Sequence, residues 1–143
     1  MTAAAPTATT NIYPFMSYDD APAAIEWLMA AFGFEAVAVY PAEDGSINHA
    51  ELRLGDGGWV MLSSTREDRF NVHTPRRLGA STQGIAAYVD DIDAHYARAK
   101  VAGAEMVDEL SDTDYGARGY TARDPEGHLW SFGNYRPGAP AAG

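Results

Sequence analysis

The chain has 143 residues, of which 46% are hydrophobic and 21% are charged, and this composition is typical of one globular domain. Ten Lys and Arg residues stand against 20 Asp and Glu residues, and the resulting net charge of −10 argues against nucleic acid as a partner, because its phosphates would be repelled. The absence of cysteine excludes disulfides, thiolate catalysis and cysteine-bound zinc.

Neither a signal peptide nor a membrane span is expected. The first ten residues contain no basic segment followed by an apolar run, and no apolar run in the chain approaches the roughly 20 residues that a spanning helix needs. We therefore expect no contact with a membrane and, by default, a cytoplasmic location. Residues 1–11 and 137–143 are rich in Ala, Thr, Pro and Gly without periodicity, which predicts flexible tails.

The first half of the chain predicts a strand, a helix and three further strands. The helix is expected at residues 21–32, where Ile25, Leu28 and Phe32 share one face. Asp20 is suited to cap its beginning, and Gly33 is suited to its left-handed end. The strands are expected at residues 12–17, 36–40, 48–54 and 59–63.

The second half repeats this pattern at a nearly constant offset. Tyr88 of Tyr88-Val89-Asp90-Asp91 follows Ser17 of Ser17-Tyr18-Asp19-Asp20 by 88 − 17 = 71 residues, and Gly103 follows Gly33 by 103 − 33 = 70. A helix is expected at residues 92–102, and strands at residues 84–89, 106–110, 118–123 and 128–134.

The repeat predicts an α+β fold made of two βαβββ modules with curled mixed sheets. The modules span residues 12–63 and 83–136, and together they form a single domain over residues 12–136. The stretch between them, residues 64–82, is polar and contains Pro75-Arg76-Arg77, which is typical of an exposed connector.

The turn Asp124-Pro125-Glu126-Gly127 lies directly before the last predicted strand. A doubled βαβββ unit with this ending resembles the vicinal oxygen chelate (VOC) superfamily, which includes glyoxalase I, bleomycin-resistance proteins and extradiol dioxygenases. The resemblance covers about residues 11–136, and the stretch His49–Asp56 is similar to the glyoxalase/bleomycin-resistance and PhnB-like members. It implies that the sheets curl around a cavity and that the protein forms a homodimer. Open sheet edges, which favour pairing, agree with a dimer.

The resemblance also implies that a divalent metal often lies in the cavity, held by His, Glu or Gln side chains of the first and last strands of each module. The corresponding positions here are Tyr13 and Met61 in the first module and Gly84 and Ser131 in the second. None of these is a ligand of that type. We therefore expect neither a metal nor another cofactor, which argues against metal-dependent glyoxalase, epimerase and dioxygenase chemistry.

The alternation of side chains along the strands predicts which residues face the cavity. Trp130 and Phe132 are expected under the helix instead. The cavity-facing set combines aromatic surface with a few polar anchors, as small-molecule pockets do. Its members are Tyr13, Phe15, His49, Glu51, Trp59, Met61, Tyr88, Thr121, Arg123 and Ser131.

Three functions are consistent with this set. The first is a metal-free small-molecule binding protein that resembles bleomycin-resistance proteins and sequesters or carries an aromatic or cationic compound, with Glu51 as counter-charge, in an antibiotic-resistance role. The alternative is a glyoxalase-like lyase, isomerase or dioxygenase with a relocated site, in which Glu51 is the base and His49 its partner. The third is a structural or regulatory protein with a filled cavity. His49 and Glu51 are equally consistent with a simple hydrogen-bonded pair on one strand.

Overall fold

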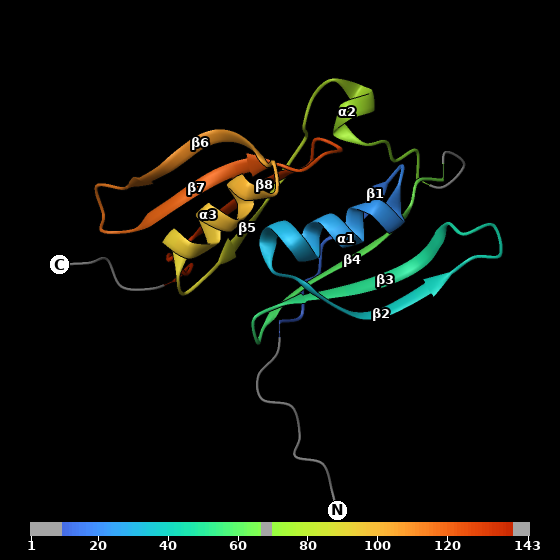
Figure 1. The fold of residues 1–143 in the computed structure, drawn as a ribbon, viewed down its shortest axis with the longest axis horizontal. Helices are drawn as coiled ribbons and strands as arrows, with labels where there is room; N and C mark the ends of the chain where they lie inside the picture. Colours follow the sequence, from blue (N-terminus) through green and yellow to red (C-terminus); the bar gives the residue numbers. More distant parts are fainter. Residues whose placement is uncertain (1–9, 67–69, 139–143) are drawn as a thin grey trace, which may run out of the picture.

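The computed structural model describes residues 10–66 and 70–138, which form two modules of the same plan (Figure 1). The predicted tails, residues 1–11 and 137–143, lie largely outside this part of the chain. Each module has one four-stranded sheet, in the order β1-β4-β3-β2 and β5-β8-β7-β6. The first module comprises β1 (Phe15–Tyr18), α1 (Ala21–Phe32), β2 (Glu35–Pro41), β3 (Ile47–Leu54) and β4 (Gly58–Ser64). The second comprises β5 (Gly84–Tyr88), α3 (Ile92–Val101), β6 (Glu105–Asp112), β7 (Arg118–Arg123) and β8 (Leu129–Gly133).

Both sheets are mixed, since β1 runs parallel to β4 and β5 parallel to β8 while the remaining pairs are antiparallel. The α+β class and the two βαβββ modules are thereby confirmed. The strand registers also reproduce the sequence repeat. Phe15 pairs with Met61 and Ala86 pairs with Ser131, so the equivalent residues are offset by 86 − 15 = 71 and 131 − 61 = 70.

Two details differ from the sequence prediction. The first strand begins at Phe15 rather than at residue 12, because Pro14 has no N–H to donate, although its carbonyl still accepts from Met61 N at 2.9 Å. The connector contains a short helix, α2 (Pro75–Leu78), that was not predicted. Thr74 caps it by accepting a hydrogen bond from Arg77 N at 3.3 Å.

One hydrophobic core serves both modules. Trp130 and Phe132 are fully buried, as predicted, and Phe32 of α1 packs against both rings with centroid distances of 5.5 and 4.6 Å. The helices α1 and α3 lie side by side (Figure 1). Arg98 of α3 donates to the carbonyl of Ala30 at 2.8 Å, which satisfies an open carbonyl near the end of α1.

Within residues 10–66 and 70–138, the structure has no helix with the length and apolar composition needed to span a membrane.

Candidate functional site

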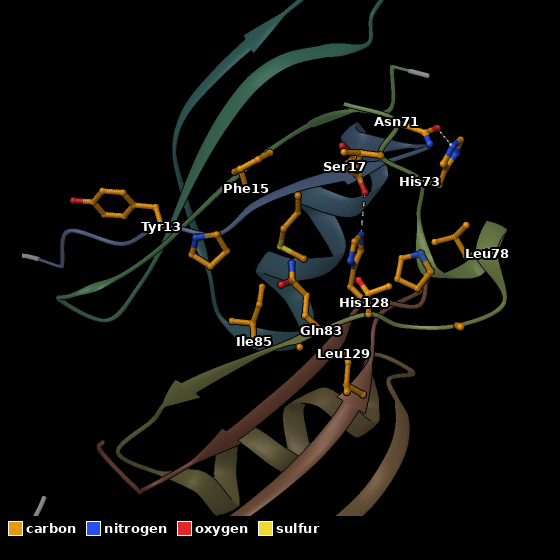
Figure 2. A pocket seen from close by; sticks show the side chains of 17 residues that line it. Tyr13, Phe15, Ser17, Asn71, His73, Leu78, Gln83, Ile85, His128 and Leu129 are labelled. Carbon is orange, nitrogen blue, oxygen red and sulfur yellow. Dashed lines mark hydrogen bonds between the residues drawn. The ribbon is translucent and has the colours of Figure 1, made fainter. Parts of the chain in front are cut away.

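A cleft of about 490 Å³ lies between the two modules (Figure 2). One wall is β1 with the residues before it, and the opposite wall is formed by β5 and the beginning of β8. The connector covers the space between these walls. The lining consists of Tyr13, Pro14, Phe15, Met16, Ser17, Asn71, Val72, His73, Pro75, Leu78, Ala80, Thr82, Gln83, Gly84, Ile85, His128 and Leu129.

The connector is held over the cleft by contacts at α2. The backbone N–H of Arg76 donates to the carbonyl of Glu126 at 3.0 Å, which ties α2 to the turn between β7 and β8. The guanidinium of Arg77 donates to Asp19 at 2.9 Å. Partial burial would raise the pKa of Asp19, but its hydrogen bonds, first among them the one from Arg77, outweigh this and lower the pKa. The carboxylate is therefore ionised at neutral pH and anchors the connector to the end of β1.

Beside the cleft, the modules are joined through the buried carboxylate of Asp124. One of its oxygens accepts from the hydroxyl of Tyr18 at 2.7 Å and from the indole of Trp130 at 3.0 Å. The other accepts from the backbone N–H groups of Glu126 and His128, both at 3.0 Å. Burial, followed by the charge of Asp124, raises the pKa of Tyr18, so its hydroxyl stays protonated and remains a donor. This network fixes β1 relative to the beginning of β8.

Two histidines contact the cleft, His128 from the residue before β8 and His73 from the connector (Figure 2). The ring of His128 donates from Nε2 to the carbonyl of Ser17 at 2.9 Å, a bond between the two modules. His73 is joined through Nε2 to the amide oxygen of Asn71 at 2.9 Å. The Nε2 of His128 therefore links the two walls of the cleft, whereas His73 belongs to the connector.

A second, smaller cavity of about 180 Å³ lies on the face of the first sheet that is turned away from α1. Phe15 contributes to both cavities, and His49 and Met61 contribute to the smaller one. His49 and Glu51 point the same way from β3, and His49 Nε2 lies 2.9 Å from Glu51 Oε2. The side chains of His49 and Glu51 are 41% and 40% exposed to solvent.

The other predicted site residues line neither of these cavities, and their roles stay predictions. The guanidinium of Arg53 lies 5.7 Å from the ring of Trp59, and that of Arg136 lies 3.6 Å from the ring of Tyr88. In the second sheet the hydroxyls of Thr121 and Ser131 are 3.0 Å apart. Arg123 donates to the hydroxyl of Ser81 at 3.1 Å. The predicted set is therefore spread over both sheets, with only Tyr13 and Phe15 in the larger cleft.

Sequence reasoning missed the contribution of the connector. Asn71, His73 and Thr82 line the cleft but fall outside the two repeated units, so the repeat could not place them. The local signal that was available is the sequence around α2. Thr74 and Pro75 suit the first positions of a helix and Gly79, with φ +74°, suits its end.

The residues at the metal-ligand positions of the resemblance do not fit a divalent metal. The phenol of Tyr13 donates to the carbonyl of Thr10, and Ser131 is engaged with Thr121. Met61 offers a thioether and Gly84 no side chain. In the part of the chain that the structure describes, no three His, Asp or Glu side chains lie close enough together to hold a metal ion.

Comparison with known proteins agrees with the family resemblance noted from the sequence. The family model of the Glyoxalase/Bleomycin resistance protein/Dioxygenase superfamily matches residues 12–132. The uncharacterized protein Mb0911c of Mycobacterium bovis is 37% identical over 122 residues, which are 84% of this chain and 80% of that protein. The crystal structure of TioX from Micromonospora sp. ML1 is 35% identical with a TM-score of 0.73 and covers 89% of this chain and 99% of TioX.

A more distant neighbour is a mutant of the fosfomycin resistance protein FosX from Listeria monocytogenes, complexed with Mn(II) and 1S,2S-dihydroxypropylphosphonic acid. Its TM-score is 0.63, and the alignment covers 87% of this chain and 89% of that one. At 16% identity the likeness shows a shared fold alone.

Proposed function

Because this chain belongs to the Glyoxalase/Bleomycin resistance protein/Dioxygenase superfamily, we propose that it binds a small organic molecule in the cleft between its modules and does so without a metal ion. The observation that carries the proposal is the cleft itself. Its volume of about 490 Å³ lies in the range of small-molecule sites, and it opens between the first strands of the two modules. Tyr13 and Gly84, two of the positions that would hold a metal, lie in its wall.

The lining supports a flat, largely apolar ligand. The rings of Tyr13 and Phe15 are 42% and 67% exposed, so aromatic surface is available to a ligand at the mouth of the cleft. Such binding needs no catalytic group, and the proposed role is to sequester or carry the compound, as in an antibiotic-resistance function. A structural protein with a filled cavity, the third hypothesis from the sequence, is not supported by an open cleft of this size.

The proposal is tested with a variant that fills the cleft. Ala80 lines the cleft and is exposed, so Ala80→Trp places an indole in the cleft mouth without disturbing the core. Val101→Trp is the matched control, because Val101 is 90% exposed at the end of α3 and lines neither cavity. Both variants and the native protein are screened for thermal stabilisation by planar aromatic compounds and by metal-free bleomycin.

We expect at least one compound to raise the Tm of the native protein and of Val101→Trp but not of Ala80→Trp. Metal analysis of protein purified without chelator is expected to find far less than one ion per chain. The proposal fails if no compound stabilises the native protein, if Ala80→Trp responds equally, or if a stoichiometric divalent ion is present.

A second candidate function rests on the contact of 2.9 Å between His49 and Glu51 at the smaller cavity. A carboxylate paired with an imidazole beside a cavity is an arrangement that transfers protons in lyases and isomerases. It is tested by incubating each stabilising compound with the native protein and with Glu51→Gln, followed by mass spectrometry of the recovered compound. Conversion by the native protein that is lost in Glu51→Gln would favour this function. Unchanged compound in both samples would favour binding alone.

The proposal includes a homodimer. Both sheets end in open edge strands, and apolar side chains such as Phe15 and Val37 are 67% and 46% exposed in the single chain. Light scattering coupled to size-exclusion chromatography is expected to give twice the chain mass of 15.3 kDa. A mass of one chain at micromolar concentration would contradict this part of the proposal.

A further inference from the structure

We infer that the ligand of the cleft is uncharged and that it is held by hydrogen bonds to the open backbone edges of β1 and β5. The inference rests on the proposed function, because it presupposes that the cleft binds a small molecule. It also narrows that function, since the sequence left cationic and aromatic ligands equally open.

The first observation is the chemistry of the lining. Within residues 10–66 and 70–138, no Asp, Glu, Lys or Arg lines the cleft, and its basic side chains are the imidazoles of His73 and His128. The two neighbouring cavities differ in this respect. Arg66 lines the smaller cavity on the first sheet, and Asp20, Asp124 and Glu126 are among the residues of a cavity of about 300 Å³ between α1 and the β7–β8 turn. An ionic ligand in the cleft would lose hydration without gaining a carboxylate, ammonium or guanidinium partner from the described lining, whereas an uncharged ligand avoids that cost.

The second observation is the backbone of β1, which is an edge strand because it pairs with β4 alone among the described strands. The carbonyl of Pro14 accepts a hydrogen bond from Met61 N of β4, and the carbonyl of Tyr18 accepts one from Thr65 N, directly after β4. Both distances are 2.9 Å. Peptide groups of successive residues point to opposite sides of a strand, so Phe15 and Ser17 direct theirs away from β4. The bond from His128 to the carbonyl of Ser17 agrees with this direction and occupies that carbonyl, so the edge that faces a ligand is formed by the peptide groups of Phe15.

β5 presents the same kind of edge from the second module. Val89 N donates to the carbonyl of Gly133 at 2.9 Å, so every second residue counted back from Val89 directs its backbone N–H and C=O groups toward β8. Gly84 lies at the alternate positions and directs its backbone groups away from β8. Gly84 lines the cleft and has no side chain to cover its own peptide groups. The cleft therefore offers backbone donors and acceptors on two sides, and these can form the hydrogen bonds that an uncharged polar ligand needs.

Gln83 is the side chain best placed to complete this recognition. It lies directly before β5, is exposed, and extends from the β5 side toward β1 in Figure 2. A side-chain amide both donates and accepts hydrogen bonds. A ligand with adjacent donor and acceptor atoms, such as an amide, lactam or urea on an aromatic body, matches this amide and the two backbone edges together.

The test uses three probes that share one aromatic body and differ in charge: N-methyl-2-naphthamide, 2-naphthoate and 2-naphthylmethylammonium. Binding is measured by isothermal titration calorimetry at pH 7.5 with the native protein, Gln83→Leu, Gln83→Glu and the distant control Val101→Trp. We expect the native protein and Val101→Trp to bind the naphthamide at least tenfold more tightly than either ion. Gln83→Leu should weaken naphthamide binding by about five- to tenfold.

Gln83→Glu supplies the converse result. The new carboxylate should strengthen binding of the ammonium probe several-fold and weaken binding of the naphthamide. This pair of changes would show that the probes bind beside residue 83. If the ammonium or the naphthoate binds the native protein as tightly as the naphthamide, or if the Gln83 variants bind as the native protein does, the inference is overturned while the proposed function stands. If none of the three probes binds, this inference is overturned, and the screen with Ala80→Trp decides the proposed function separately.

Discussion

Asp124 connects the two modules through a single buried carboxylate. Its side chain is 5% exposed, and its two oxygens accept four hydrogen bonds from Tyr18, Trp130, Glu126 and His128. A carboxylate is the side chain suited to this position because it accepts on both oxygens and donates on neither. The Asp-Pro-x-Gly turn that marks the sequence therefore has a structural role at the junction between the modules.

Replacing this carboxylate by an amide tests that role. In Asp124→Asn one oxygen is exchanged for an NH₂ group, so two of the four donors lose their acceptor whichever way the amide is turned. We expect the free energy of unfolding to fall by about 3 kcal/mol, and by about 1.5 kcal/mol in Tyr18→Phe, which removes one donor only. Urea unfolding measures both values. Asp56→Asn, in an exposed turn, is the matched control and should change stability by less than about 0.5 kcal/mol; an Asp124→Asn effect as small as this would contradict the role.

His95 contributes a pH dependence to stability. Its Nε2 must carry the proton, because it faces the carbonyl of Phe32 at 2.8 Å, and its Nδ1 then accepts from the hydroxyl of Tyr120 at 2.7 Å. Burial lowers the pKa of His95 below the ordinary 6.5, and the charge of nearby Arg98 acts in the same direction, against the hydrogen bond to Phe32. The unfolded chain therefore takes up this proton at a higher pH than the folded protein.

Because the folded-state pKa is the lower one, the contribution of His95 is complete above pH 6.5 and is lost as the pH falls from there toward the folded-state pKa. We expect the urea midpoint to fall between pH 7.5 and pH 5.5, and to fall less in His95→Gln, which cannot be protonated. Val101→Gln, at a position that is 90% exposed at the end of α3, should retain the full pH dependence. Equal slopes in the native protein and His95→Gln would show that other groups cause the change.

At the scale of the elements, the two helix ends offer a comparison within one molecule. Gly33 and Gly103 follow α1 and α3 with φ values of +79° and +88°, a conformation that costs an L-residue about 1 kcal/mol. A Cβ at Gly103 would meet nothing within 4 Å, whereas a Cβ at Gly33 would lie 3.2 Å from the guanidinium of Arg98. That guanidinium donates to the carbonyls of Met29 and Ala30 at the end of α1.

We therefore expect Gly33→Ala to destabilise the protein more than Gly103→Ala, by about 2 against about 1 kcal/mol, because only the former displaces a hydrogen-bonded side chain. Urea unfolding of the two variants gives the comparison directly. In Arg98→Ala the difference between the two glycine substitutions should disappear. A larger effect at Gly103, or a difference that persists without Arg98, would contradict this account.

The elements themselves follow closely from local patterns. The sequence predicted that Trp59 and Met61 share the cavity-facing side of β4, and the structure buries the alternate residues Val60 and Leu62, to 3% and 2% exposure. This works because burial of one face of a strand leaves a period of two in the sequence. The helix in the connector was missed because four residues are too few to show a period, although its capping residues were visible.

At the scale of the whole molecule, the sequence predicted two similar modules but not how they meet. The bonds from Tyr18 to Asp124 and from His128 to Ser17 join residues 106 and 111 positions apart. Such pairs involve single polar residues in turns and strand ends, where no hydrophobic period identifies a partner. The cleft depends on this docking, which is why the sequence assigned the ligand site to the faces of the sheets while the structure places the larger opening between their edges.

The shared core predicts that both modules unfold in one transition. Phe32 from the first module packs against Trp130 and Phe132 of the second, so neither module can lose its structure without exposing the core of the other. Labelling with 5-fluorotryptophan gives separate ¹⁹F signals for Trp27 and Trp59 in the first module and Trp130 in the second. We expect the three native signals to disappear at urea midpoints within about 0.2 M of one another, and to move together to lower urea in Asp124→Asn. A midpoint for Trp59 that differs from that of Trp130 would show that the modules are independent folding units, and the cleft between them would then not be a fixed site.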